Sequence, residues 1–202
     1  KPFDGEAGGE ILETSVTYNV FEAIRSAKEE VVASSPYFVP GPVSMEMLQE
    51  LRSRGVKVTV MTNSLASTDE PIVHIGYAAH RVELLRMGID LYELSSSRLK
   101  DNKRPFLFGK SLGRLHAKLV VIDKKRLFIG SMNLDPRSAT INTELGAMID
   151  SPPLARELLR VIDIDRLQSA YRVRLNPNGA GLQWLSNDGD KEFILNNEPD
   201  ST

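Results

Sequence analysis

The residues best suited to chemistry are concentrated within positions 115–133. They form the pattern H-x-K, four residues, D, six residues, G-S-x-N, with fixed positions at His116, Lys118, Asp123, Gly130, Ser131 and Asn133. An imidazole, an ammonium, a hydroxyl and an amide together suit a phosphodiester. The ammonium and the polar groups would bind the non-bridging oxygens, while the imidazole attacks phosphorus or moves a proton.

Side chains alternate along a strand, and this alternation divides the motif between two faces. If residues 115–122 form a strand, His116 and Lys118 point to the same side of the sheet and Asp123 points away from both. We therefore predict that Asp123 supports the site by bonding backbone amides at the turn, without contacting substrate.

A second strand at 127–129 is predicted to return the chain toward the histidine. Gly130 then allows a tight exit, so that Ser131 and Asn133 come back to the His116 end. No cluster of carboxylates suited to magnesium accompanies the motif, so the sequence predicts metal-independent chemistry without a cofactor. A lone H-x-K is usually accidental, but six fixed positions match by chance with a probability on the order of 10⁻⁵ or less.

The composition is that of an ordinary globular domain. The 202 residues are 41% hydrophobic and 26% charged, enough for one sizeable core. No apolar run approaches the roughly 20 residues of a membrane-spanning helix. A net charge of −2 disfavours a dedicated nucleic-acid binder but leaves room for a local basic groove. The absence of cysteine excludes disulfides, thiolate metal sites and cysteine nucleophiles.

Hydrophobic periodicity predicts alternating helices and strands. Helices are expected at 14–28, 45–54, 72–87 and 152–167, and strands at 31–33, 56–61, 89–94, 142–150, 171–175 and 182–185. The last two strands form a hairpin through NPNGAG, while SSPYFVPGP, TNSLASTDEP and DPRSAT are loops. Two successive β-α-β crossovers imply a largely parallel sheet with helices on its faces.

The chain is expected to form one lobe with polar ends. Residues 1–13 are interpreted as a tail or linker, 14–186 as the lobe, and 187–202 as a frayed polar tail. Between 95 and 114 lies a basic segment carrying Lys100, Lys103, Arg104, Lys110 and Arg114. This segment is either a solvated loop, the usual role of such charge runs, or a rim that attracts a phosphate.

The motif HAKLVVIDKKRLFIGSMN resembles the HKD signature of the phospholipase D superfamily. SSPYFVP, TNSLASTDEPIVHIGY, LLRMGIDLYEL and SMNLDPRSATINTELGAMIDS resemble the C-terminal half of bacterial cardiolipin synthases, so the likeness covers nearly the whole chain. The resemblance implies an α/β/α sandwich around a mixed, largely parallel β-sheet. It also implies two HKD motifs across a pseudo-twofold axis, where one histidine forms a phosphohistidine and the other serves as acid and then base.

Only one HKD motif occurs in this sequence. His74 and His80 have no lysine two residues on, and we interpret them as ordinary helix-face residues. Either the chain is the C-terminal lobe of a two-motif enzyme, or it completes its site as a homodimer, as the small nucleases of the superfamily do. We favour the first, because the chain lacks a natural beginning and resembles the second lobe specifically.

The resemblance assigns a role to each motif residue. His116 would protonate the leaving alcohol and later deprotonate the incoming one. Lys118 and Asn133 would hold the phosphoryl oxygens, with Ser131 assisting. Glu144, within NTELG, matches the family's downstream acidic residue, which orients a catalytic histidine of the opposite lobe; alternatively it is a solvated strand carboxylate.

The implied reaction is phosphatidyl transfer through a phosphohistidine to phosphatidylglycerol, giving cardiolipin and a small alcohol. The donor, phosphatidylglycerol or phosphatidylethanolamine, is left open. The implied partners are a membrane surface, on the cytoplasmic face of the bacterial inner membrane, and the N-terminal lobe or a second copy. A homodimeric nuclease or phosphodiesterase and a non-catalytic half-domain are the alternatives. Five apolar residues would contact acyl chains or, more in keeping with their type, pack in the core: Tyr37, Phe38, Val39, Phe106 and Phe108.

Overall fold

The computed structural model describes residues 15–95, 115–179, 181–188 and 191–199. Within them, one sheet of nine strands has the order β6-β5-β4-β1-β2-β3-β7-β8-β9. The strands are β1 (Glu30–Ser34), β2 (Lys57–Asn63), β3 (Asp90–Leu94), β4 (Lys118–Ile122), β5 (Arg126–Gly130), β6 (Gly146–Asp150), β7 (Ala170–Leu175), β8 (Leu182–Asp188) and β9 (Lys191–Leu195). The helices are α1 (Val16–Arg25), α2 (Pro42–Ser53), α3 (Pro71–Arg86), α5 (Pro136–Thr140) and α6 (Pro152–Ser169).

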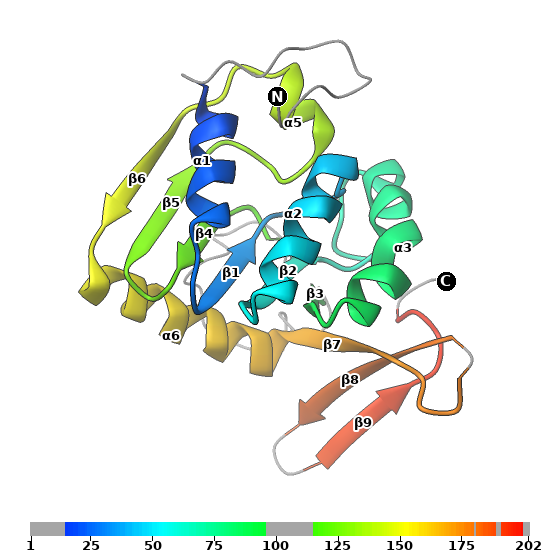
Figure 1. Cartoon of the computed structure of the whole chain (residues 1–202). Helices are drawn as coiled ribbons and strands as arrows, with labels where there is room; N and C mark the ends of the chain where they lie inside the picture. The colour runs from blue at the N-terminus through cyan, green and yellow to red at the C-terminus, as the bar shows by residue number, and fades with distance from the viewer. Residues whose placement is uncertain (1–14, 96–114, 180, 189–190, 200–202) are drawn as a thin grey trace.

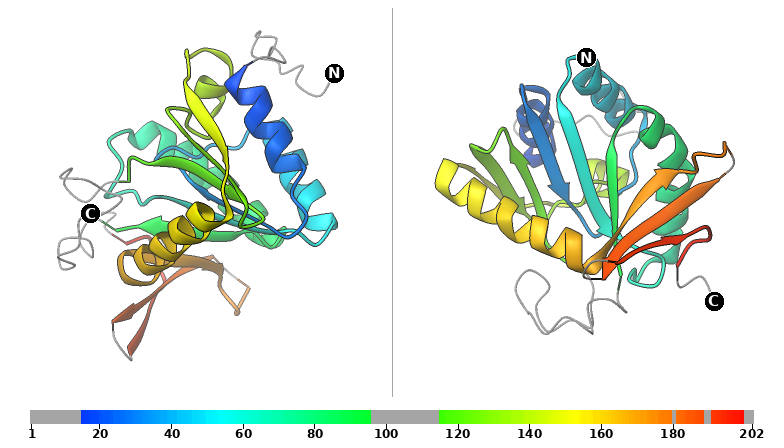
Figure 2. Two further views of the ribbon diagram at one scale, coloured as in Figure 1. Left: turned by 90° about the vertical axis from the view of Figure 1, so that its left-hand side faces the viewer. Right: turned by 90° about the horizontal axis from the view of Figure 1, so that it is seen from below.

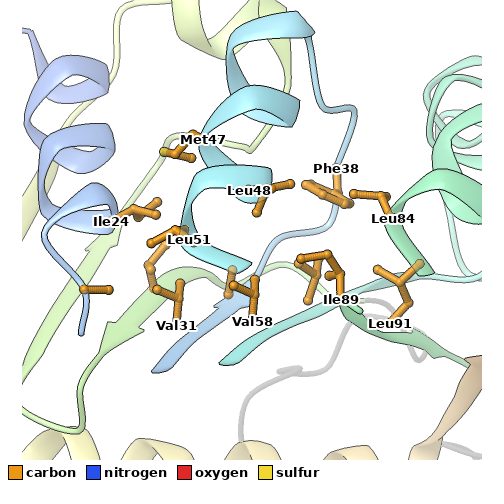
Figure 3. Packing of buried hydrophobic residues seen from close by; sticks show 14 of the residues in the cluster. Ile24, Val31, Phe38, Met47, Leu48, Leu51, Val58, Leu84, Ile89 and Leu91 are labelled. Carbon is orange, nitrogen blue, oxygen red and sulfur yellow. The ribbon is translucent and has the colours of Figure 1, made fainter. Parts of the chain in front are cut away.

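Helices cover both faces of the sheet, as the predicted α/β/α sandwich requires. Helices α1, α2 and α3 lie on one face, and α6 crosses the other (Figure 1, Figure 2). Alternation along β1 illustrates the division, because Val31 and Ala33 join the core under α1–α3 whereas Val32 joins the core under α6. Figure 3 shows the first core, in which Leu51 of α2 is wholly buried above the strands.

The sheet is mixed, as predicted, but it is not largely parallel. Only the pairs β1·β2 and β2·β3 are parallel among the described strands, and the other pairs are antiparallel. The β-α-β crossovers read from the sequence supply those two parallel pairs. On either side of these three strands, each described strand is antiparallel to its neighbour, which corrects the expectation.

A tight hairpin joins the two motif strands. Asp123 and Lys124 have positive φ angles of 50° and 56°, and Lys125 N–H donates to the Ile122 carbonyl oxygen at 3.0 Å. Positive φ at both central residues is the geometry of a type I′ turn, whose twist matches that of the flanking strands. The central residues of the turn are thus Asp123 and Lys124, and Arg126 already belongs to β5.

Two segments differ from the sequence-based expectation. DPRSAT is not a loop, because Asp135 accepts a hydrogen bond from Ser138 N–H at 2.9 Å and Pro136 follows as the first residue of α5. An N-cap followed by proline is a helix start signal. The polar C-terminal segment does not fray over 191–195, where β9 pairs with β8, with Trp184 opposite Leu195.

A buried ionic cluster attaches the C-terminal segment to α3. Arg81 Nε lies 2.8 Å from Glu93 Oε1, and Arg81 Nη2 donates to Glu198 Oε1 at 2.5 Å. The guanidinium also lies over the rings of Tyr77 and Trp184, at 4.9 and 5.5 Å from their centroids. Burial alone raises the pKa of Glu198, but hydrogen bonds from His74 and Arg81 outweigh it and lower the pKa to about 2.

Candidate active site

The motif histidine is placed by an amide at the end of β2, which β1 separates from β4 in the sheet. Asn63, the last residue of β2, accepts a hydrogen bond from Leu115 N–H at 2.9 Å and donates to the Leu115 carbonyl oxygen at 3.3 Å. This pairing fixes the extended segment that leads to His116. The predicted strand at 115–122 thus begins only at Lys118, and His116 stands beyond its end with an exposed side chain.

A pocket of about 570 Å³ gathers the motif side chains. It is lined by Pro36, Tyr37, Asp69, Leu115, His116, Ala117, Lys118, Leu119, Ile129, Gly130, Ser131 and Asn133. Strand β4 supplies the lysine, and the segment after β5 supplies the serine and the asparagine. The structure therefore brings together the imidazole, ammonium, hydroxyl and amide that the sequence pattern placed in one group.

Lys118 is the lysine or arginine among the described residues that line the pocket. Its Nζ donates to the His116 carbonyl oxygen at 2.9 Å, which draws the ammonium toward the histidine segment. Burial lowers the pKa of Lys118, while the carboxylates of Glu144, Asp69 and Asp135 oppose the shift. A partly buried ammonium has lost some of its contacts with water. An anion such as a phosphoryl oxygen would replace those contacts by accepting a hydrogen bond from it.

Glu144 is tied to the motif through Ser131. The Ser131 hydroxyl donates to the Glu144 carboxylate and accepts a hydrogen bond from Leu145 N–H at 3.0 Å. Ser131 N–H also donates to the Leu145 carbonyl oxygen at 2.8 Å. Glu144 is thus held beside the pocket and acts on Lys118, although its side chain is only half-buried and it does not line the pocket wall.

The carboxamide of Asn133 has a buried oxygen that lacks a hydrogen-bond partner within the described residues. Leaving such an atom unbonded costs about 1–3 kcal/mol, so these groups are rare outside functional sites. Either end of the amide can face the pocket after rotation of the side chain. Asn133 is therefore suited to binding a group that enters the pocket.

Gly130 lies where β5 and β6 approach each other closely. A Cβ atom at this position would lie 2.5 Å from the Leu145 carbonyl oxygen and 2.6 Å from Phe128 Cζ. It pairs with Gly146 across β5 and β6, and a Cβ there would lie 2.2 Å from Phe128 Cε2. Gly130 thus lets β6 approach closely enough for Leu145 to bond Ser131.

Asp123 lies at the far end of β4 from the pocket and bonds backbone amides. Its carboxylate accepts hydrogen bonds from the N–H groups of Lys28, Glu29 and Glu30 at 2.8–3.2 Å. These donors belong to the segment entering β1, not to the turn that contains Asp123. The carboxylate therefore joins the motif hairpin to the start of the central strand.

Replacing Asp123 by alanine should lower the free energy of unfolding by about 1–3 kcal/mol at pH 7, because three backbone donors lose a charged acceptor. Burial alone raises the pKa of Asp123, but these donors outweigh it and hold the pKa below its usual range. The stabilisation is therefore full above the unfolded-state pKa of about 3.9 and disappears as pH falls through the lower folded-state pKa.

Urea denaturation of wild type and Asp123→Ala between pH 7 and pH 2 would measure this difference. His116→Ala is the matched control within the same motif, since the histidine side chain is exposed. The supporting role of Asp123 would be contradicted if Asp123→Ala lowered the free energy of unfolding no more than His116→Ala does. It would also be contradicted if the effect of Asp123→Ala were the same at low pH as at pH 7.

Three of the residues that build or line the pocket region lie outside the sequence motif. Asn63 and Asp69 carry no sequence signal beyond their place in a polar loop after a strand. Tyr37 was expected to contact acyl chains or to pack in the core, yet its hydroxyl donates to Asp69 Oδ1 at 2.7 Å in the pocket wall. Loops that follow parallel strands of a sheet gather at one edge, and this placement is the signal that could have identified them.

The other candidate side chains have different surroundings. Phe38 is a core residue, 5% exposed, whose ring lies 5.9 Å from that of Tyr77. Val39 packs close to Gly76. His74 is buried with Nε2 2.6 Å from Glu198 Oε1, so it is more than a helix-face residue. Phe106, Phe108 and the basic segment before the motif lie outside the described residues.

A family model described as "Cardiolipin synthase, PLD-like domain" matches residues 20–165. Cardiolipin synthase C of Escherichia coli K12 is 40% identical over 185 residues, which make up 89% of this chain and 38% of that protein. Cardiolipin synthase 2 of Staphylococcus epidermidis is 31% identical over 143 residues, or 71% of this chain and 26% of that protein. The chain therefore spans well under half the length of these relatives.

Solved structures share the fold at lower identity. Nuc from Salmonella typhimurium, a phospholipase D family member, is 23% identical with a TM-score of 0.61, covering 81% of this chain and 93% of that one. Phosphatidylserine synthase of Haemophilus influenzae is 12% identical with a TM-score of 0.57, covering 78% of this chain and 36% of that one. In the part of the chain that the structure describes, no helix combines the length and apolar character needed to cross a bilayer.

Proposed function

This chain belongs to the phospholipase D-like domain family described for cardiolipin synthases, and on that premise we propose that it is the C-terminal catalytic half of a phosphatidyltransferase. The observation that carries the proposal is the pocket that holds His116, Lys118, Ser131 and Asn133 together. The 40% identity to cardiolipin synthase C over 89% of the chain supports the transferase. The lobe, expected over 14–186, is proposed to include β9 as well, because β9 pairs with β8 in the same sheet. It surrounds the matched residues 20–165.

The proposed roles follow from the chemistry of each side chain. Lys118 and Asn133 bind the non-bridging phosphoryl oxygens, and Ser131 assists them. His116, exposed at the pocket, transfers protons to and from the alcohol oxygens. Glu144 orients the histidine of the opposite lobe from its position beside Ser131. Asp123 and Gly130 keep the motif strands in place.

The reaction has two balanced steps. A histidine nitrogen of the other lobe forms a bond to phosphorus while the donor's phosphorus–oxygen bond breaks, and the leaving alcohol takes a proton from His116. The hydroxyl of phosphatidylglycerol then loses its proton to His116 as its oxygen bonds to phosphorus and the phosphorus–nitrogen bond breaks. Cardiolipin and a small alcohol are the products, and neither step requires a metal ion or a redox cofactor.

Each step needs groups on opposite sides of phosphorus, and this chain supplies one motif histidine. The partner is proposed to be the N-terminal lobe of a longer chain, with a second copy of this lobe as the alternative. The match to only 38% of cardiolipin synthase C is consistent with a missing lobe. A two-tailed phospholipid substrate further implies peripheral binding at a membrane surface, on the cytoplasmic face of the inner membrane.

The complete gene product incubated with phosphatidylglycerol vesicles should form cardiolipin and release glycerol, as detected by lipid mass spectrometry. Parallel incubations with mixed vesicles of phosphatidylglycerol and phosphatidylethanolamine, in which released ethanolamine is measured against released glycerol, would identify the donor lipid. Cleavage of DNA without any cardiolipin would overturn the proposal in favour of a nuclease. Absence of both activities would favour a non-catalytic half-domain.

The isolated 202-residue chain should be inactive as a monomer, because a single histidine cannot act as nucleophile and as proton donor on the opposite face. Turnover should appear when the complementary lobe is added. If two copies of the chain share the site instead, the rate of turnover should rise with the square of chain concentration. Activity and oligomeric state would be measured in the same fractions after gel filtration. Robust turnover by a demonstrated monomer would refute the two-lobe arrangement.

A further inference from the structure

The segment that carries His116 runs beyond the end of its neighbouring strand. Strands β1 and β4 pair antiparallel up to Ser34, the last residue of β1 (Figure 1). The same register would place residues 36–38 opposite 115–117. The chain after β1 instead turns to Leu134, with which it forms a parallel bridge. Within the described residues, 115–117 therefore belong to no strand.

The side chain of Asn63 takes the place of the missing strand. Its carboxamide oxygen accepts a hydrogen bond from Leu115 N–H at 2.9 Å, and its nitrogen donates to the Leu115 carbonyl oxygen at 3.3 Å. A residue of a paired strand would offer the same combination of one acceptor and one donor. Because an N–H group can only donate, these two partners also fix which end of the carboxamide faces which atom.

This substitute pairing is buried. Asn63 and Leu115 are each 2% exposed, so water does not replace their hydrogen bonds. The amide nitrogen also lies 3.5 Å from the Pro36 carbonyl oxygen. Asn63 is itself fixed in the sheet, where β2 pairs it with Leu94 of β3. The backbone of Leu115 thus has a defined position relative to the central strands.

The amide places the histidine more directly than the phosphate-binding residues. Leu115 immediately precedes His116, whose backbone has no strand partner. Lys118 belongs to β4 and lies opposite Gly130 of β5, and Asn133 follows β5. The pairing of β4 with β5 therefore positions the groups that would bind the phosphoryl oxygens. The Lys118 ammonium also bonds the His116 carbonyl oxygen, but through a long side chain that can move with the segment.

We propose that Asn63 is a positioning residue, which acts through Leu115 to hold the His116 imidazole within reach of the alcohol oxygen. Proton transfer requires the two atoms to lie at hydrogen-bond distance. A small displacement of the imidazole should therefore slow the chemical steps without weakening phosphate binding. The inference rests on the proposed phosphatidyl transfer and on the role of His116 as acid and base, and it adds the group that sets the geometry of that histidine.

Asn63→Leu in the complete gene product removes both hydrogen bonds at similar side-chain size. With phosphatidylglycerol vesicles, kcat should fall about 10- to 100-fold, the effect of a displacement of about 1 Å, while KM stays within about twofold. Thr62→Val is the matched control. Thr62 is also buried, and its hydroxyl donates to the Pro36 carbonyl oxygen at 3.3 Å, so the variant loses a buried hydrogen bond that does not involve Leu115. Its kcat should stay within about twofold of wild type.

Both variants would be assayed at a temperature at which thermal unfolding shows them to be folded. If Asn63→Leu does not fold, Asn63→Asp provides the same test. The introduced carboxylate keeps an acceptor for Leu115 N–H but, when ionised, has no donor for the Leu115 carbonyl oxygen.

A change of leaving group shows whether Asn63 acts through His116. Phosphatidyl-4-nitrophenol differs from phosphatidylglycerol in its alcohol, and its phosphorus–oxygen bond breaks to release the phenolate without a proton from an acid. Single-turnover release of 4-nitrophenolate should therefore stay within about threefold of wild type in both His116→Ala and Asn63→Leu. Transfer from phosphatidylglycerol should be slow in the same preparations.

The inference would be overturned, with phosphatidyl transfer intact, by any of three results for Asn63→Leu. These are a kcat close to that of wild type, a kcat loss matched by Thr62→Val, and a release of 4-nitrophenolate slowed as much as the transfer. Slow release of 4-nitrophenolate by His116→Ala would instead contradict the proposed role of that histidine as acid. Absence of transfer by wild type would remove the proposed function, and in both of these cases the inference would fall with it.

Discussion

His116→Ala in the complete enzyme should lower kcat by about 10³-fold or more, because both proposed steps depend on proton transfer by this imidazole. The side chain is exposed at the pocket, and its backbone is placed by the bonds of Asn63 to Leu115, which the substitution leaves intact. The free energy of unfolding should therefore change by no more than about 0.5 kcal/mol. Initial rates of phosphatidyl transfer and urea denaturation of the same preparations measure the two effects.

His80→Ala is the matched control for this prediction. His80 lies in α3 and does not line the pocket, so its removal should preserve kcat within about twofold. A fall in kcat of less than about tenfold for His116→Ala would exclude it as the acid and base of the reaction. A large loss of stability would mean that the histidine supports the fold.

Arg81→Met should lower the free energy of unfolding by about 3 kcal/mol, because it breaks a buried ion pair. Glu93 is wholly buried and would keep only the donors from Tyr77 and Trp184, at 3.0 and 2.8 Å, without its counter-charge. Glu198 would lose its ion pair with Arg81 and keep its contact with His74. For a domain of this size, the loss corresponds to a fall of about 6–12 °C in Tm.

The double variant Arg81→Met/Glu93→Gln separates charge burial from packing. Removing the unpaired carboxylate should recover part of the lost stability, because most of the penalty comes from burying a charge without a partner. Thermal unfolding of the wild type, both single variants and the double variant provides the coupling energy. A loss below about 1 kcal/mol for Arg81→Met would show that burial of Glu93 does not depend on the charge of Arg81.

Local patterns in the sequence were sufficient to predict the elements that carry the motif. Periodicity located the helices and central strands to within a few residues. Alternation predicted that Asp123 points away from His116 and Lys118 and bonds backbone amides. Its carboxylate does accept hydrogen bonds from backbone N–H groups, but Asp123 lies in the turn beyond β4 and not within the strand. The amides are those of 28–30, over 90 residues away in sequence, and no local pattern could have identified them.

The features that the sequence did not predict depend on contacts between distant segments. Asn63 bonds Leu115 across 52 residues, and Tyr37 bonds Asp69 across 32. From its composition, the C-terminal segment was expected to be too polar to be ordered. In the structure, the apolar residues of β9 pair with β8, and Glu198 forms an ion pair with Arg81 of α3. Composition reports average polarity, whereas pairing depends on which partners the fold provides.

The balance of parallel and antiparallel strands was also beyond local reasoning. The crossovers around β1, β2 and β3 are visible as strand-helix-strand patterns, and they account for both parallel pairs. Which strand then lies beside β1 is a long-range choice, and β4 takes that place antiparallel. That choice brings His116 to the same edge of the sheet as the loops carrying Tyr37 and Asp69.

The covalent intermediate is the most direct test of the two-lobe account. The complete enzyme, quenched under alkaline conditions during turnover of phosphatidylglycerol, would be digested and its peptides examined by mass spectrometry for a phosphatidyl adduct on histidine. The account predicts an adduct on a histidine of the other lobe and none on His116, which carries protons in both steps. An adduct on His116, or turnover without any histidine adduct, would contradict it.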